Sequence, residues 1–96
     1  MTYIDDIAGQ IRSRIPADLV PPASDALFRI YAVLAEAKGT AVTARDVHNA
    51  WTAWMAGQRR EHPSLIPFDE LGAAVQAEDE VFVAAIRAVA AARGGV

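Results

Sequence analysis

Four residues near the middle of the chain have side chains suited to an anionic, aromatic ligand: Trp54, Arg59, Arg60 and His62. Arg59 and Arg60 form the only adjacent basic pair, and a guanidinium group binds phosphate through two parallel hydrogen bonds. Trp54 precedes this pair and offers a flat ring on which a planar base can stack. His62 would stand on the rim of the same pocket. The pattern predicts a site for a nucleotide-derived or other small anionic ligand.

Each of these side chains also has a purely structural explanation, and the sequence leaves both open. Arg59 and Arg60 would then be the solvated end of a helix. Trp51 and Trp54 are three residues apart and share one helix face, so one would lie in the core and the other would be half-exposed. His62 would bind a backbone carbonyl or face water.

A stiff segment follows these residues, and we call Pro63–Pro67 the elbow. The two prolines fix two backbone dihedral angles and remove two backbone donors, so the segment has little conformational freedom. We expect Leu65, Ile66 and Phe68 to reach different parts of the core. The elbow would then close a pair of helices.

Composition limits the function classes that fit the chain. It has 96 residues, of which 53% are apolar, and this size suits a single helical domain spanning residues 1–96. The net charge of -3 argues against a nucleic-acid binder. The absence of cysteine excludes disulfides and thiolate metal sites. The acidic N-terminus does not resemble a signal peptide, and no apolar run reaches the roughly 18 residues of a membrane span. We expect a soluble, cytoplasmic protein without a cofactor.

Apolar periodicity predicts an all-α fold of four main helices and a short helical turn, with no sheet. The first helix carries Ile4, Ile7, Ile11 and Ile15 on one stripe and ends before Pro16. Three more helices are expected at about residues 24–38, 43–56 and 78–93. In the second, Phe28 and Val33 broaden the stripe and indicate burial on more than one side. The array would be compact, orthogonal or bundle-like.

Local signals predict where these helices begin and end. Ser24 is expected to cap the second helix, and Gly39 to end it. Thr43 and Asp46 form a capping-box pattern for the third. Pro67 suits the first position of the short turn. Residues 78–80 are all acidic and are expected to open the last helix, which Gly94 and Gly95 would end.

Residue patterns for catalysis or metal binding are weak. His48 and His62 with Glu61 or Asp46 lack a known ligand spacing. No nucleophile motif or phosphate-binding glycine loop is present, so we do not expect an enzyme. A helix-turn-helix over residues 24–56 has suitable lengths, but its second helix offers Arg45 as its single basic residue.

Three segments of residues 44–90 resemble the repeat domain of ryanodine receptors. That family's pattern has a His-x-x-Trp helix, a Gly-Trp-x-x-Gly element and a His-Pro-x-Leu-Val-Pro-Tyr-x-x-Leu segment before an Asp-bearing helix. The matching residues here are His48 and Trp51; Trp54 and Gly57; His62, Pro63, Leu65, Ile66, Pro67, Phe68 and Leu71; and Asp79. Ala53 replaces the glycine that leads the second element, and the Trp51–His62 interval is short, so the receptor's inserted loop should be missing or trimmed.

The resemblance implies a helical, non-enzymatic sensing module with two long helices paired around the elbow. Ligands derived from nucleotides are part of that expectation, although a shared fold does not establish function. The alternative is an interaction protein that self-associates or docks on a partner. The alanine-rich segment Val83–Ala92 would permit close helix packing, and small chains often gain buried surface by dimerising.

Overall fold

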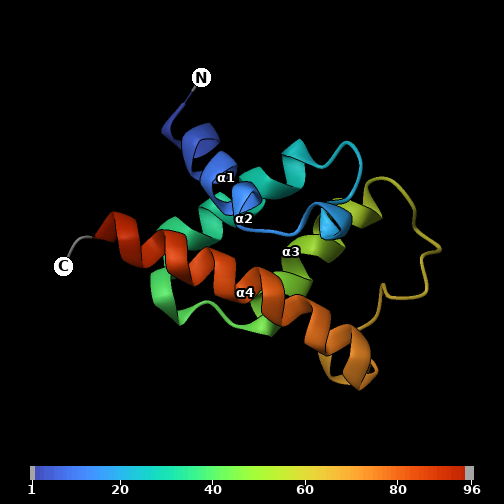
Figure 1. Cartoon of the computed structure of the whole chain (residues 1–96). Helices are drawn as coiled ribbons and strands as arrows, with labels where there is room; N and C mark the ends of the chain where they lie inside the picture. The colour runs from blue at the N-terminus through green and yellow to red at the C-terminus, as the bar shows by residue number, and fades with distance from the viewer. Residues whose placement is uncertain (1, 95–96) are drawn as a thin grey trace.

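The computed structural model describes residues 2–94, and within them the chain is all-α (Figure 1). Four helices follow one another as α1 (Tyr3–Ser13), α2 (Asp25–Lys38), α3 (Ala44–Ala56) and α4 (Ala73–Gly94). Single 3₁₀ turns lie between them at Ala17–Leu19 (η1), Gly39–Ala41 (η2) and Phe68–Glu70 (η3). No strand occurs in this part of the chain. The predicted fold class is confirmed.

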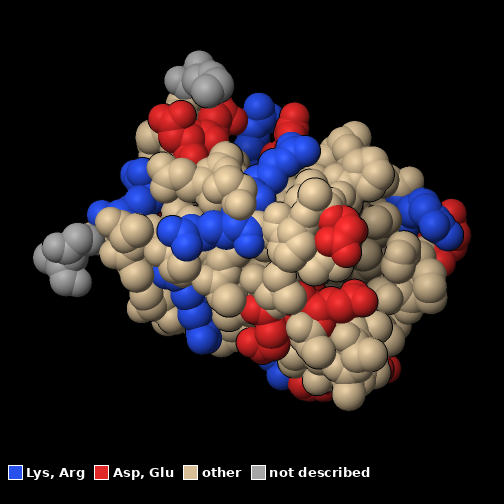
Figure 2. Space-filling view, viewed as in Figure 1, with Lys and Arg blue, Asp and Glu red and all other residues tan. Residues whose placement is uncertain are grey.

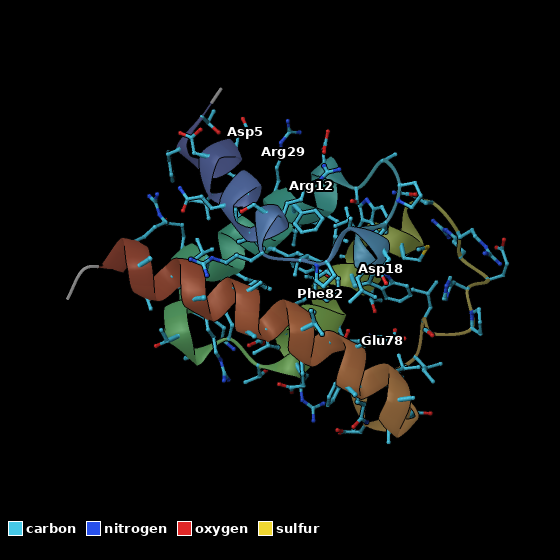
Figure 3. The ribbon with its side chains drawn as sticks, in the orientation of Figure 1. Asp5, Arg12, Asp18, Arg29, Glu78 and Phe82 are labelled. Carbon is cyan, nitrogen blue, oxygen red and sulfur yellow. The ribbon has the colours of Figure 1, made fainter. Side chains whose placement is uncertain are left out.

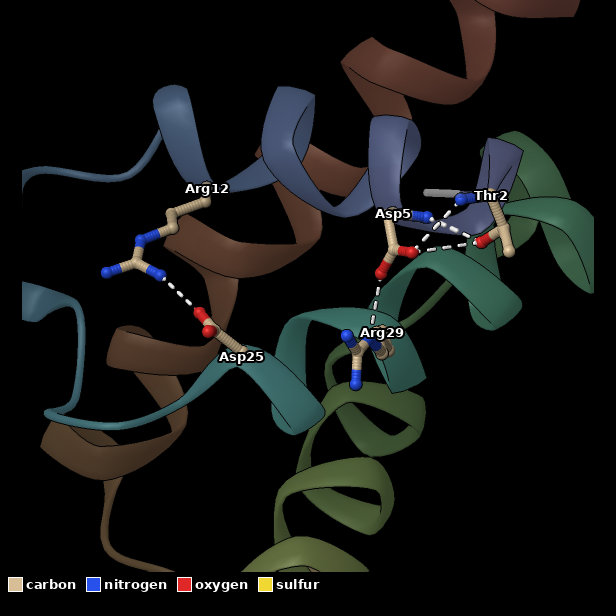
Figure 4. A network of polar contacts seen from close by, with 5 residues as sticks. All are labelled: Thr2, Asp5, Arg12, Asp25 and Arg29. Carbon is tan, nitrogen blue, oxygen red and sulfur yellow. Dashed lines mark hydrogen bonds and ion pairs between the residues drawn. The ribbon is translucent and has the colours of Figure 1, made fainter.

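Helix α1 is fixed at its start by a capping box and along its length by α2. The Thr2 hydroxyl accepts from the Asp5 amide at 3.3 Å, and the Asp5 carboxylate accepts from the Thr2 amide at 3.1 Å. Two ion pairs join the helices, Arg29–Asp5 at 2.8 Å and Arg12–Asp25 at 2.7 Å (Figure 4). These pairs are largely exposed, so they orient the helices more than they stabilise them.

Helix α2 packs against α1, α3 and α4. Leu27, Phe28 and Tyr31 are at most 1% exposed, which confirms that the helix is buried on more than one side. Val33 is 53% exposed, so its expected place in the buried stripe was wrong. Gly39 ends the helix with a φ of 57°, a conformation that glycine adopts without steric cost.

The start of α2 corrects one prediction. Ser24 occupies the N-cap position, but its side chain does not cap the helix. Its hydroxyl instead donates to the Pro21 carbonyl at 2.6 Å. The preceding residue, Ala23, has a φ of 52°, and this left-handed turn directs Ser24 back toward the proline pair. Ser24 therefore stabilises the connector rather than the helix.

Helix α3 begins with the predicted capping box: Thr43 and Asp46 each accept from the other's amide, at 3.2 and 2.9 Å. Trp54 is 9% exposed and belongs to the core, whereas Trp51 is half-buried. On the outer face Arg45 pairs with Asp69 at 2.7 Å and thereby ties α3 to η3.

Helix α4 begins five residues earlier than the acidic run indicated, at Ala73. The amides of Val75 and Gln76 both donate to the Gly72 carbonyl at 3.1 Å, and the Gln76 side chain donates to the Phe68 and Leu71 carbonyls. These bonds, together with the alanines of the first turn, nucleate the helix ahead of the acids. Residues 78–80 therefore lie in its second turn. The helix continues to Gly94, while Gly95 lies outside the described residues.

The elbow is anchored to α3 by its backbone. Nε2 of His48 donates to the Ile66 carbonyl at 2.6 Å, and Phe68, just beyond the elbow, packs against the core. Ile66 is 38% exposed, so the prediction that it reaches the core was wrong. The hydrogen bond explains this, because it turns the Ile66 carbonyl toward α3 and leaves the side chain near the surface.

Candidate ligand-binding site

A cavity of 250 Å³ lies between α2, α3 and α4 and is bounded by the connector before α2 and by the loop that leads into the elbow. Its lining residues are Leu19, Pro21, Leu27, Tyr31, His48, Trp51, His62, Ser64, Val75, Glu78, Asp79 and Phe82. Phe82 and Glu78 project from the side of α4 that faces η1, where Asp18 lies (Figure 3). Pockets for drug-sized ligands hold roughly 300–1,000 Å³, so this one suits a single ring system.

Aromatic rings form much of the cavity wall. Trp51 lies between two histidines: His48 stacks on it with a centroid separation of 5.7 Å, and His62 meets it edge-on at 5.0 Å. Tyr31 on α2 and Phe82 on α4 also line the cavity, and their ring centroids are 5.6 Å apart. The packing of α2, α3 and α4 holds these rings in place. Flat walls of this kind favour a planar ligand.

Asp79 contributes the most unusual polar atom of the site. Its Oδ2 is buried and, among the side chains of residues 2–94, is the one buried nitrogen or oxygen without a hydrogen-bond partner. Burial raises the pKa of Asp79 to about 6, the electrostatic influence of His48 acts in the opposite direction, and Glu78 and Glu80 raise it further. A carboxylate in this state requires donors that the neighbouring protein side chains do not supply.

His48 presents one nitrogen to the elbow and leaves the other free. Because a carbonyl oxygen can only accept, the 2.6 Å contact with Ile66 places the hydrogen on Nε2. In the neutral ring Nδ1 is then an acceptor, and within the described chain it has no hydrogen-bond partner. No group of three or more metal-ligating side chains occurs in residues 2–94 that could hold a metal ion.

Tyr31 lines the same cavity and carries a hydroxyl group. Burial raises the pKa of Tyr31, and the nearby Asp79 carboxylate raises it further, so the phenol stays protonated across the physiological pH range. The hydroxyl therefore remains available as a donor. The cavity thus combines one acceptor group at Asp79 with a donor at Tyr31.

The four residues predicted from the sequence do not meet in this cavity. His62 lines it. Trp54 lies in the core, and Trp51 provides the aromatic surface that we had expected from Trp54. Arg59 and Arg60 are exposed in the loop that precedes His62, and Arg59 lies 3.9 Å from Glu61. The predicted site and the cavity therefore share one residue.

The residue that sequence reasoning missed as a site is Asp79, although a signal for it exists. Val75, Asp79, Phe82 and Ile86 are spaced four, three and four apart, which is the spacing of one helix face. An acid at a position of that stripe is directed toward the interior, whereas Glu78 and Glu80 beside it are exposed. Starting α4 at residue 78 concealed the stripe, because Val75 then lay outside the helix.

Surface charge along α4 changes sign from one end to the other. Viewed as in Figure 1, acidic side chains gather over the N-terminal half of the helix and basic ones over its C-terminal half (Figure 2). The acidic half is the one that lines the cavity. None of the helices in residues 2–94 has the length and hydropathy that a membrane crossing requires.

Comparison with known proteins identifies a family without a described activity. The chain has no significant match among curated proteins or among solved structures. One family model matches residues 2–91, which include the first three helices and most of α4. The similarity to ryanodine-receptor repeats stays a prediction. The chain belongs to the family described as "Domain of unknown function (DUF7701)".

Proposed function

We propose that this protein is a small-molecule-binding module whose ligand enters the cavity between α2, α3 and α4. The observation that carries the proposal is the buried, unpartnered Oδ2 of Asp79, a residue of a cavity wall in which five of the twelve lining residues carry aromatic rings. Leaving a buried acceptor unpaired costs about 1–3 kcal/mol. A ligand that pairs with this atom recovers that free energy, and this gain favours ligand binding in the cavity.

The ligand that fits best is derived from a nucleotide. Its base would occupy the cavity beside Trp51, since 250 Å³ accommodates one ring system but not a whole nucleotide. The sugar and any phosphate would remain outside. Arg59 and Arg60 are exposed in the loop that leads to His62, so they supply positive charge on the elbow side of the cavity. In this proposal the arginines contribute to affinity but do not form the pocket.

Nucleosides and nucleotides added to the protein test this proposal. Thermal unfolding and tryptophan fluorescence would be followed at two protein concentrations. A ligand at about 100 times its dissociation constant adds roughly 2.7 kcal/mol, which raises the midpoint of a domain this size by about 10–20 °C. The ligand-induced fluorescence change should disappear in Trp51→Phe. It should persist in Trp54→Phe, the matched control, because Trp54 lies outside the cavity.

Two results would overturn the proposal. One is the absence of any shift with every nucleoside and nucleotide in the panel. The other is a fluorescence change that survives in Trp51→Phe and is lost in Trp54→Phe. A midpoint that rises with protein concentration, without any ligand effect, would identify a self-associating interaction module instead.

A further inference from the structure

The chemistry around Asp79 restricts which base the cavity accepts, if the cavity is the ligand site proposed above. An ionised carboxylate only accepts hydrogen bonds, and its two oxygens can accept two parallel ones. Asp79 lines the cavity, and its Oδ2 is buried without a partner. The complementary group is therefore an edge that carries two adjacent N–H donors.

Charge in the cavity wall supports a donor and argues against an anion at this point. The lining contains Glu78 and Asp79 but neither lysine nor arginine. Bringing a phosphate among these carboxylates would place like charges together in a poorly solvated space. A neutral or cationic donor edge instead relieves the mutual repulsion of the acids.

Donors elsewhere in the lining suit a carbonyl oxygen of the ligand. Nδ1 of His62 accepts from the Ser64 amide at 3.1 Å, so the neutral ring carries its hydrogen on Nε2 and donates from there. Tyr31 lines the same cavity, and its phenol is a donor as well. A ring with one carbonyl oxygen beside two N–H groups therefore finds both kinds of partner, and the aromatic walls match its flat shape.

We infer that the cavity selects a planar heterocycle with a guanidine-like edge, such as guanine, whose two adjacent N–H groups pair with the Asp79 carboxylate. Adenine matches this arrangement poorly, because its edge offers one donor beside a ring acceptor, and the acceptor would face the negative carboxylate. Inosine keeps the carbonyl and one N–H but lacks the exocyclic amine. The three nucleosides therefore differ in the number and arrangement of hydrogen-bond donors that they present to Asp79.

The titratable groups around Asp79 are Tyr31 on α2, His48 on α3, His62 in the loop before the elbow, and Glu78 and Glu80 on α4. Asp79 must be ionised to accept two donors, and burial raises its pKa to about 6. Guanosine binding should therefore strengthen as the pH rises through 6. A ligand that needs a protonated Asp79 would show the opposite trend.

Calorimetric titration of the full chain with guanosine, inosine and adenosine at pH 5, 6 and 7.5 tests the inference. At pH 7.5 guanosine should bind at least tenfold more tightly than either of the others. Asp79→Asn should weaken guanosine binding at least tenfold and remove its pH dependence, since an amide offers only one acceptor. Glu80→Gln is the matched control, because it removes the negative charge of the adjacent residue, which does not line the cavity. It should leave the preference for guanosine unchanged.

The outcomes separate this inference from the proposed function. Adenosine binding that is tighter than guanosine binding, and stronger below pH 6, would overturn the guanidine-like edge while the ligand site stands. Equal effects of Asp79→Asn and Glu80→Gln would likewise overturn the role of Asp79. If no nucleoside or nucleotide binds, both the proposed ligand site and the inferred base preference are overturned. Circular dichroism of each variant checks its fold, and the pH series on the unmodified protein needs no variant.

Discussion

His48 on α3 donates its Nε2 hydrogen to the Ile66 carbonyl across 2.6 Å, and this bond joins that helix to the elbow. The same ring stacks on Trp51 and lines the cavity. One buried side chain therefore fixes both the position of the elbow and one wall of the candidate site. A stiff loop between two prolines can be held by so few contacts because it has little entropy to lose.

Replacing His48 by leucine should destabilise the protein by about 1–3 kcal/mol, because the Ile66 carbonyl loses its partner while the volume stays similar. Urea unfolding measures this change. Amide exchange at Leu65, whose N–H donates to the His62 carbonyl within the same loop, should accelerate. Asn49→Ala, at the exposed neighbouring position, should alter neither. If neither stability nor amide exchange changes in His48→Leu, the hydrogen bond from His48 is not what holds the elbow in position.

Replacing Asp79 by asparagine should stabilise the ligand-free protein above pH 6. The folded pKa of about 6 lies above the usual 3.8, so protonation favours folding. Stability from this group is present below pH 4 and is lost as the pH rises through 6. The pKa shift by itself corresponds to about 3 kcal/mol of folding free energy. Because the carboxyl is partly exposed, solvent screening lowers the expected effect to about 1 kcal/mol.

Urea unfolding of Asp79→Asn and Glu80→Gln between pH 4 and 8 checks this expectation. The difference between the unmodified protein and Asp79→Asn should grow from pH 4 to 6 and then level off. A difference that is flat over this range, or that matches the one for Glu80→Gln, would contradict it. A gain in stability together with a loss of binding would mark Asp79 as a residue kept for function at the expense of folding.

Asp5 should produce the opposite pH dependence. A hydrogen bond from Arg29, followed by one from the Thr2 amide, lowers the pKa of Asp5 to about 2. Its stabilising contribution is therefore present above pH 4 and is lost as the pH falls toward 2. Asp5→Asn should reduce stability at pH 7 and flatten the acid limb of the unfolding profile. Asp6→Asn is the matched control in the same turn, and an equal effect there would show that only the helix dipole matters.

Ala23 offers a site where a single substitution should stabilise the chain. Its φ of 52° costs an alanine about 1–2 kcal/mol, whereas glycine adopts this conformation freely. After the extra backbone entropy of glycine is subtracted, Ala23→Gly should gain about 0.5–1 kcal/mol. Ala84→Gly, on the exposed face of α4, should instead lose about 1 kcal/mol. Thermal unfolding of both variants tests this expectation. A loss of stability in Ala23→Gly would contradict it.

Much of the fold follows from local features of the sequence. The apolar stripes, the Thr43–Asp46 capping box and Gly39 are each determined within one or two helix turns, and the structure contains all of them. Predictions failed where a different contact nearby in the chain competed with the expected signal. Ser24 resembles an N-cap, yet its hydroxyl bonds the Pro21 carbonyl. The acids at residues 78–80 resemble a helix start, yet Gln76 and the Gly72 carbonyl begin α4 earlier.

The candidate site depended on tertiary structure far more than the fold did. The sequence by itself determined an all-α chain, its helix order and a rigid elbow next to His62, because these properties arise from neighbouring residues. Only the packing of α2, α3 and α4 decided that Trp51 rather than Trp54 lines the cavity, and that Asp79 lies in its wall. Helix periodicity shows which residues share a face, but the side chains opposite them come from segments distant in the chain, and their contacts set burial and charge.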